Sequence, residues 1–137
     1  MERLGDGVRD DLHAHDHTMS IPIQQVVREL VELLGATTVA VIGGVRETRA
    51  VQQWTGDREP QRPNVLRFAL QLGTMIATAR DREIARAWFH GANPRLDDQV
   101  PMLMLRDLPL AEIQAPLLRA VRAFARRDGA SAVGGHT

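Results

Sequence analysis

The chain has 137 residues, of which 44% are hydrophobic, and its 17 basic and 17 acidic side chains give a formal net charge of zero. This length allows one domain or two small ones that share a core, and the composition predicts a folded chain. The absence of cysteine excludes disulfides, thiolate zinc sites and a cysteine nucleophile. Because the net charge is zero, any nucleic-acid contact must come from a local patch. No apolar run approaches the roughly 20 residues that cross a bilayer, and the N-terminus resembles no targeting peptide, so we expect a cytoplasmic protein.

The two ends of the chain are predicted to be flexible tails, residues 1–19 and 128–137. The first contains His13, His15 and His17 beside acidic residues, which are ligand types that bind divalent metals. No second cluster elsewhere completes a closed site, so we expect no metal site. The second tail is rich in glycine and other small residues.

Residues 20–62 are predicted to form a helix-turn-helix region. Apolar residues recur at helical spacing from Val26 to Leu34. A short helix capped by Thr37 or Thr38 then ends at the glycine pair that begins at Gly43. After a turn, a third helix capped by Thr48 would place Trp54 inward. Helix, short helix, glycine-containing turn and third helix is the helix-turn-helix plan.

In that plan the third helix enters the DNA major groove. Arginine recognises guanine and glutamine recognises adenine through paired hydrogen bonds, while further arginines bind phosphates. The side chains available for these tasks are Arg46, Thr48, Arg49, Gln52, Gln53, Arg58 and Arg62. A helical unit that reads no DNA and acts only as an interaction module remains an alternative.

Residues 63–127 are predicted to form a linking helix and a small helical domain that share a core with the first half. The linking helix starts at Pro63, carries Phe68 at the edge of its buried stripe, and either ends at Asp81 or continues to Phe89. Gly91 ends the following helix. Asn93-Pro94 makes a corner, Asp97 or Asp98 caps the next helix, and Pro101 lies in its first turn. The last helix contains Pro116, so its continuous part is predicted to start near Gln114.

No catalytic constellation is visible in the sequence. His90 is the only histidine in the predicted folded part, residues 20–127. No aspartate and serine at suitable spacing complete a catalytic triad with it. We therefore expect neither enzymatic activity nor a cofactor.

The second half resembles a known family. It carries a tryptophan, an asparagine-proline pair, a leucine, an acidic residue, and a proline that leads an apolar helix. Together with the ending of the helix-turn-helix from Val51 to Gly56, this pattern is similar to the Xre/MbcA/ParS-type antitoxins, over about residues 23–127. The predicted structural core of the motif is Trp54, Trp88, Phe89, Asn93, Pro94, Leu96, Pro101 and Leu105.

The resemblance implies an all-α antitoxin of a type II toxin–antitoxin module. Its partner would be a RES-type toxin that consumes NAD, neutralised by direct binding of the C-terminal domain, and its helix-turn-helix would repress its own operon. A homodimer is expected because symmetric half-sites require one. The alternative is a stand-alone DNA-binding regulator whose second half dimerises. The candidate toxin contacts, expected to be exposed, are Arg95, Asp98, Met102, Met104 and Arg106.

Overall fold

The computed structural model describes the chain from residue 12 to residue 130, and its side chains as far as residue 126. Within this range the regular elements are helical, which confirms the predicted all-α class, and no helix there is long and apolar enough to cross a membrane. An N-terminal helix covers residues 12–20. It is followed by α2 (Ile23–Leu34), α3 (Ala36–Gly43), α4 (Thr48–Trp54), α5 (Pro63–Ala79), α6 (Arg82–His90), the 3-10 turn η1 (Pro94–Leu96), α7 (Pro101–Asp107) and α8 (Leu110–Ala130).

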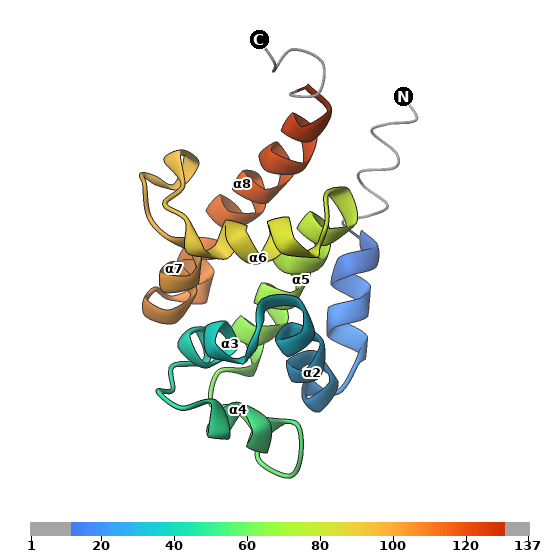
Figure 1. Cartoon of the computed structure of the whole chain (residues 1–137), viewed down its shortest axis with the longest axis vertical. Coiled ribbons are helices and arrows are strands. Elements are labelled where there is room, and N and C mark those ends of the chain that lie inside the picture. Colours follow the sequence, from blue (N-terminus) through green and yellow to red (C-terminus); the bar gives the residue numbers. More distant parts are fainter. Residues whose placement is uncertain (1–11, 131–137) are drawn as a thin grey trace.

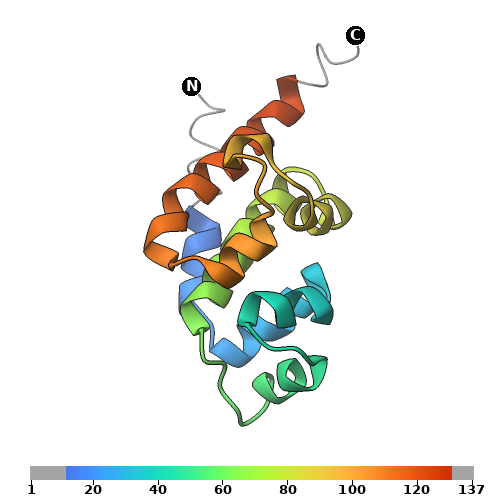
Figure 2. The same ribbon diagram turned by 90° about the vertical axis from the view of Figure 1, so that its left-hand side faces the viewer.

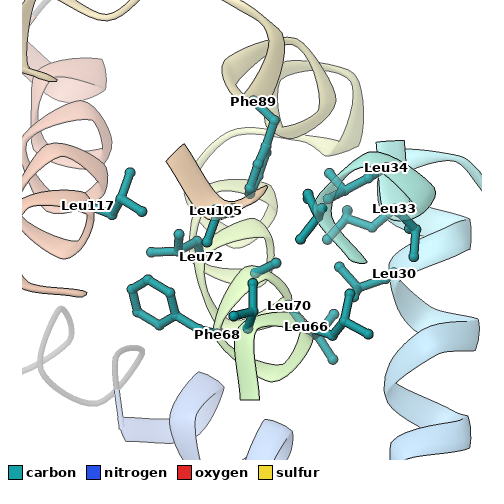
Figure 3. Close-up of a cluster of buried hydrophobic side chains, with 14 of the residues drawn as sticks. Leu30, Leu33, Leu34, Leu66, Phe68, Leu70, Leu72, Phe89, Leu105 and Leu117 are labelled. Atoms are coloured by element: carbon teal, nitrogen blue, oxygen red, sulfur yellow. The ribbon is translucent and has the colours of Figure 1, made fainter. Parts of the chain in front are cut away.

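Helix α5 lies at the centre of the molecule (Figure 1). It begins with Pro63 in its first turn, where a missing N–H is tolerated. Helices α2, α3, α6 and α8 pack around it, as a view turned by 90° also shows (Figure 2). Figure 3 shows leucines of α2, Phe89 of α6, Leu105 of α7 and Leu117 of α8 around this helix. The predicted edge position of Phe68 is wrong, because this side chain is 5% exposed and belongs to the core.

The two predicted halves share one hydrophobic core. Buried side chains from the N-terminal helix to α8 form a continuous cluster. Helices α2 and α5 approach so closely at Gly73 that an added Cβ would lie 2.7 Å from Cδ2 of Leu33. Hydrogen bonds also join the halves, between Thr38 Oγ1 and His90 Nε2 at 2.8 Å and from Arg86 Nε to the Leu33 carbonyl at 3.4 Å. The boundary near residue 62 therefore does not separate two cores.

The chain breaks between α5 and α6. Asp81 is the N-cap of α6, and its side chain accepts a 2.8 Å hydrogen bond from the backbone N–H of Ile84. Such a cap satisfies one of the free N–H groups at a helix start. Of the two predicted alternatives, an end of the helix near Asp81 is confirmed, and a continuous helix to Phe89 is wrong.

The predicted N-terminal tail is wrong for its second part, because residues 12–20 are helical. Ala14 and Thr18 of this helix are buried. The guanidinium of Arg67 on α5 donates to the carbonyl oxygens of Thr18 at 2.6 Å and Ile21 at 2.8 Å. A charged donor on main-chain acceptors is a strong hydrogen bond. The folded part of the chain therefore includes this helix, and residues 1–11 of the predicted tail lie outside the described range.

Helix α8 is continuous from Leu110 to Ala130 although Pro116 lies within it. The predicted start near Gln114 is wrong, and the predicted C-terminal tail is helical as far as residue 130. Proline removes one N–H donor from the helix. The buried side chains of Ile113 and Leu117 on either side of it hold this part of α8 in the core. Residues 131–137 of the predicted tail lie outside the described range.

Candidate interaction surfaces

The outer face of α4 is the surface predicted to contact DNA. Val51 and Trp54 are the buried residues of this helix. The Trp54 ring lies so close to the end of α3 that a Cβ on Gly43 would stand 2.6 Å from it. Burial of the ring fixes the orientation of α4 and turns its polar side chains outward. The predicted contacts that are exposed are Arg46, Thr48, Arg49, Gln52, Gln53 and Arg58.

The electrostatic field around α4 is weak. The exposed acids Glu47, Asp57 and Glu59 lie in the same stretch as three exposed arginines, so their formal charges cancel. The predicted cap by Thr48 is wrong, because the N-cap residue is Glu47 and no side chain caps the helix. Phosphate binding depends on cationic charge. The surface is therefore better equipped with donors and acceptors for base edges than with attraction for the DNA backbone.

Arg62 has a different role from the phosphate contact predicted for it. Its Nη1 donates to the carbonyl oxygens of Ile42 at 3.2 Å and Arg106 at 2.7 Å, and its Nη2 donates to that of Leu105 at 2.9 Å. These carbonyls belong to the C-terminal ends of α3 and α7, where the last carbonyls of a helix lack intrahelical partners. One guanidinium therefore caps two helices and joins the two halves of the molecule. The phosphate contact of Arg62 stays a prediction, and its guanidinium is already engaged within the molecule.

Asn93 organises the segment between α6 and α7. Its Oδ1 accepts a 2.9 Å hydrogen bond from the backbone N–H of Arg95. Its own carbonyl accepts from the N–H groups of Leu96 at 2.8 Å and Asp98 at 2.9 Å, and it forms an isolated antiparallel bridge with Gln99. A side chain that bonds to the backbone two residues later stabilises a turn. Asn93 is therefore a structural residue, as predicted.

The same segment contains unusual backbone. Asp97 and Asp98 have φ angles of 56° and 63°, and the N–H of Gln99 donates to the carbonyl of Leu96 across them. Two consecutive central residues with positive φ define a type I′ turn, in which glycine, asparagine and aspartate predominate. Neither aspartate caps α7, whose N-cap is Val100, so that prediction is wrong.

The predicted toxin contacts differ in accessibility. Arg95, Asp98 and Arg106 are exposed, and Met102 is half-buried. Met104 is only 6% exposed, so its predicted exposure is wrong. Helix α7 packs against α3, α6 and α8, which leaves it a narrow outer face. The adjoining turn therefore supplies most of the accessible surface here.

Arg106 is paired with its neighbour Asp107. Its Nε and Nη2 donate to the two carboxylate oxygens at 2.6 and 2.9 Å. These hydrogen bonds hold the pKa of Asp107 below its ordinary value of 3.8. Both side chains are exposed, so a partner carboxylate would have to compete with Asp107 for this guanidinium.

The aromatic motif of the second half is buried as predicted. Trp88 and Phe89 meet edge to face, with ring centroids 5.3 Å apart and an interplanar angle of 80°. The motif residues that the structure places in the interior are Trp54, Trp88, Phe89, Leu96, Pro101 and Leu105. Pro94 is exposed at the start of η1 and Asn93 is half-buried, so this pair belongs to the turn and not to the buried part of the motif.

Sequence reasoning missed the polar residues that join elements distant in the chain. Arg62 was predicted as a phosphate contact and Arg67 had no predicted role, yet both donate to main-chain carbonyls. Thr38 was predicted as a cap, yet it lies inside α3 and bonds to His90. The sequence offered only one hint of this pair: a polar threonine on an apolar helix, and a single histidine in the predicted folded part. The pairing itself needed the tertiary structure.

The described residues contain no group of three or more histidine, cysteine or acidic side chains arranged to hold a metal ion. Asp10 and Asp11, two of the acidic residues beside the histidines of the predicted tail, lie outside the described range. No family model, curated protein or solved structure matches this chain. The assignment of function therefore rests on the two surfaces described above.

Proposed function

We propose that the protein is the antitoxin of a type II toxin–antitoxin module, which neutralises a RES-type, NAD-consuming toxin by binding it directly. The observation that carries this proposal is the turn at Asp97 and Asp98. Left-handed backbone is disfavoured for residues other than glycine, least so for asparagine and aspartate, and residues held in it cluster at active sites and ligand-binding segments. Here the strained turn is exposed, and the hydrogen bonds of Asn93 hold it in place.

The chemistry of the surrounding surface fits a protein partner. Arg95 and Asp98 offer opposite charges on the turn, and the half-buried Met102 offers an adaptable apolar side chain. Methionine and arginine are enriched at protein interfaces. Because the shared core supports this surface, the surface is already formed in the free protein.

Co-expression with the product of the adjacent gene tests this proposal. The wild-type chain should relieve the growth arrest that the partner causes and should co-purify with it. Met102→Glu should abolish both effects, because it puts a charge in the apolar part of the interface. Gln61→Ala, at an exposed position outside both surfaces, is the matched control. A harmless neighbour, or rescue without a complex, would contradict the proposal.

The exposed polar face of α4 favours a second activity, binding of operator DNA. This activity would let the antitoxin repress its own operon, or would be the sole function if no toxin partner exists. Arg49→Ala and Gln53→Ala should each weaken binding to the DNA upstream of the gene by about 1–3 kcal/mol in a gel-shift titration. Binding should also fall with salt, and a two-fold symmetric site would require the mass of a dimer. Salt-independent binding, or binding by both variants as tight as that of the wild type, would reject DNA recognition by α4.

A further inference from the structure

The N-terminal helix, residues 12–20, has one side in the core and the other side exposed. It lies at the edge of the molecule (Figure 1), and the burial of Ala14 and Thr18 fixes its inner side. Two large hydrophobic side chains are exposed in the described part of the chain, Leu12 at 57% and Met19 at 58%, and both lie in this helix. They are two turns apart, so they share one side of it. The helix therefore presents an apolar pair in a fixed orientation.

The same helix carries two histidines with the spacing of a metal-binding pair. His13 and His17 are one helical turn apart, so their side chains are neighbours on the helix surface. Two histidines at this spacing bind zinc in helical sites. His13 is exposed and the His17 side chain is 37% exposed, so an ion from solution can reach both rings. His15 lies on another side of the helix, because each residue advances it by about 100°.

Glu29 on α2 orients the ring of His17. The distance between His17 Nε2 and Glu29 Oε1 is 2.7 Å, and Glu29 also accepts a 3.0 Å hydrogen bond from Gln25 Nε2. An ionised carboxylate only accepts hydrogen bonds, so Nε2 carries the proton and the neutral ring keeps its lone pair on Nδ1. Metal-binding histidines usually donate their second ring N–H to such an acceptor. The contact with Glu29 therefore sets the tautomer in which His17 can bind a metal through Nδ1.

One copy of the chain offers too few ligands for a closed site. In the part of the chain that the structure describes, no third histidine, cysteine or acidic side chain is placed to complete the pair. Zinc is usually held by four ligands in a tetrahedron. The charges around the pair suit a cation, since Asp16 and Glu29 are acidic and the guanidinium of Arg67 is engaged by the carbonyls of Thr18 and Ile21. The missing ligands must come from a second molecule.

We propose that the N-terminal helices of two copies of this chain share one divalent transition-metal ion, bound by His13 and His17 of each copy. Four imidazoles complete the tetrahedron, and imidazole is a preferred ligand of zinc, copper and nickel. A second copy is the occupant because it carries the same pair, and a two-fold axis through the ion makes the two halves equivalent. The approach of the two helices also shields Leu12 and Met19 from water. The inference does not depend on the proposed function.

Sedimentation velocity of the untagged full chain, with Zn²⁺ as the added metal, tests this inference. Starting from chain treated with EDTA and dialysed, Zn²⁺ should double the mass at one ion per two chains, and fresh EDTA should reverse the change. His13→Ala should abolish the doubling. His15→Ala is the matched control and should leave it intact, because this histidine lies on another side of the helix. Mg²⁺ should not replace Zn²⁺, since it prefers oxygen ligands.

Two further variants separate loss of a ligand from loss of the helix. His17→Ala also removes the contact with Glu29, whereas His13 makes no side-chain hydrogen bond to the described residues, so His13→Ala should keep the amide protection of residues 12–20. Glu29→Gln should weaken the zinc-driven association about tenfold, because it changes the group that orients His17.

Three results would overturn the inference. The first is an unchanged mass with Zn²⁺, and the second is binding of one ion per chain without association. The third is an equal doubling of the mass by His13→Ala, which would show that Zn²⁺ acts elsewhere on the surface.

Discussion

Helices α4 and α7 each have seven residues and each carries a candidate surface, yet the molecule holds them differently. Helix α4 contacts α2 and α3 and is fixed mainly by the burial of Val51 and Trp54. Helix α7 is in contact with α3, α6 and α8, and its C-terminal end is also held by Arg62. Helix α4 therefore exposes many side chains at the edge of the fold. Helix α7 exposes few, but it is held in place from several sides.

The largest expected effect comes from the interior of α7. Leu105 is fully buried, so Leu105→Ala should lower the free energy of unfolding by about 2–5 kcal/mol through lost burial and a residual cavity. Urea denaturation followed by circular dichroism measures the change. Gln52→Ala on the exposed face of α4 is the comparison and should change stability by less than about 0.5 kcal/mol. Equal effects would mean that α7 is not held more firmly than α4.

Removal of the Arg62 guanidinium, which hydrogen-bonds to the C-terminal ends of α3 and α7, should have the next largest effect on stability. Arg62→Ala leaves the carbonyls of Ile42, Leu105 and Arg106 without this donor and should cost about 1–3 kcal/mol. Amide hydrogen exchange should speed up at the C-terminal ends of both α3 and α7, while α4 is little changed. Arg62→Lys keeps the charge but not the fork of donors, so it should rescue only part of the loss. Full rescue by lysine would show that charge alone explains the effect.

A substitution in the turn before α7 should have the opposite effect and increase stability. Asp97 has a positive φ that glycine adopts without steric cost, so Asp97→Gly relieves strain. The greater freedom of glycine in the unfolded chain offsets part of this gain, so we expect a stabilisation of about 0.5 kcal/mol. Thermal unfolding of Asp97→Gly and of Asp97→Ala gives the comparison. A less stable glycine variant would show that the aspartate side chain contributes more than the strain costs.

The smallest expected effect concerns the attachment of the N-terminal helix to α2. Partial burial raises the pKa of Glu29, but hydrogen bonds from Gln25 and His17 outweigh it and hold the pKa below its ordinary value of 4.5. This contribution to stability is present above pH 4.5 and is lost as the pH falls through the lowered pKa of the folded state. Amide protection in residues 12–20 should therefore fall at low pH in the wild type. Glu29→Gln should make the loss smaller, and an identical acid response in this variant would contradict the role of Glu29.

The helices were predictable because their signal is local. The apolar spacing of α2 and α5 and the proline at position 63 each act within a turn or two of the chain. The same reasoning failed for α8, where Pro116 suggested an interruption. Core contacts on both sides of the proline outweighed its local cost, which sequence reasoning could not weigh.

The surfaces were less predictable because exposure depends on what packs from elsewhere. On α4 the prediction of outward polar residues is confirmed, since only one side of this helix is covered. On α7, helical spacing alone could not separate the buried Met104 from the half-buried Met102, because three helices cover it. The turn at Asp97 and Asp98 escaped prediction since aspartates before a helix usually cap it.

The hydrogen bonds from the Arg62 guanidinium to α7 go to main-chain carbonyls, and every residue type carries that carbonyl. Substitutions at the outward positions of α7 therefore leave its anchor intact. Substitutions in the core around α5 are tolerated less well, because its side chains must fit those of neighbours on several sides. If α7 contacts the partner as proposed, its outward residues can change while the helix keeps its place, so partner specificity can change during evolution without a matching change in the scaffold.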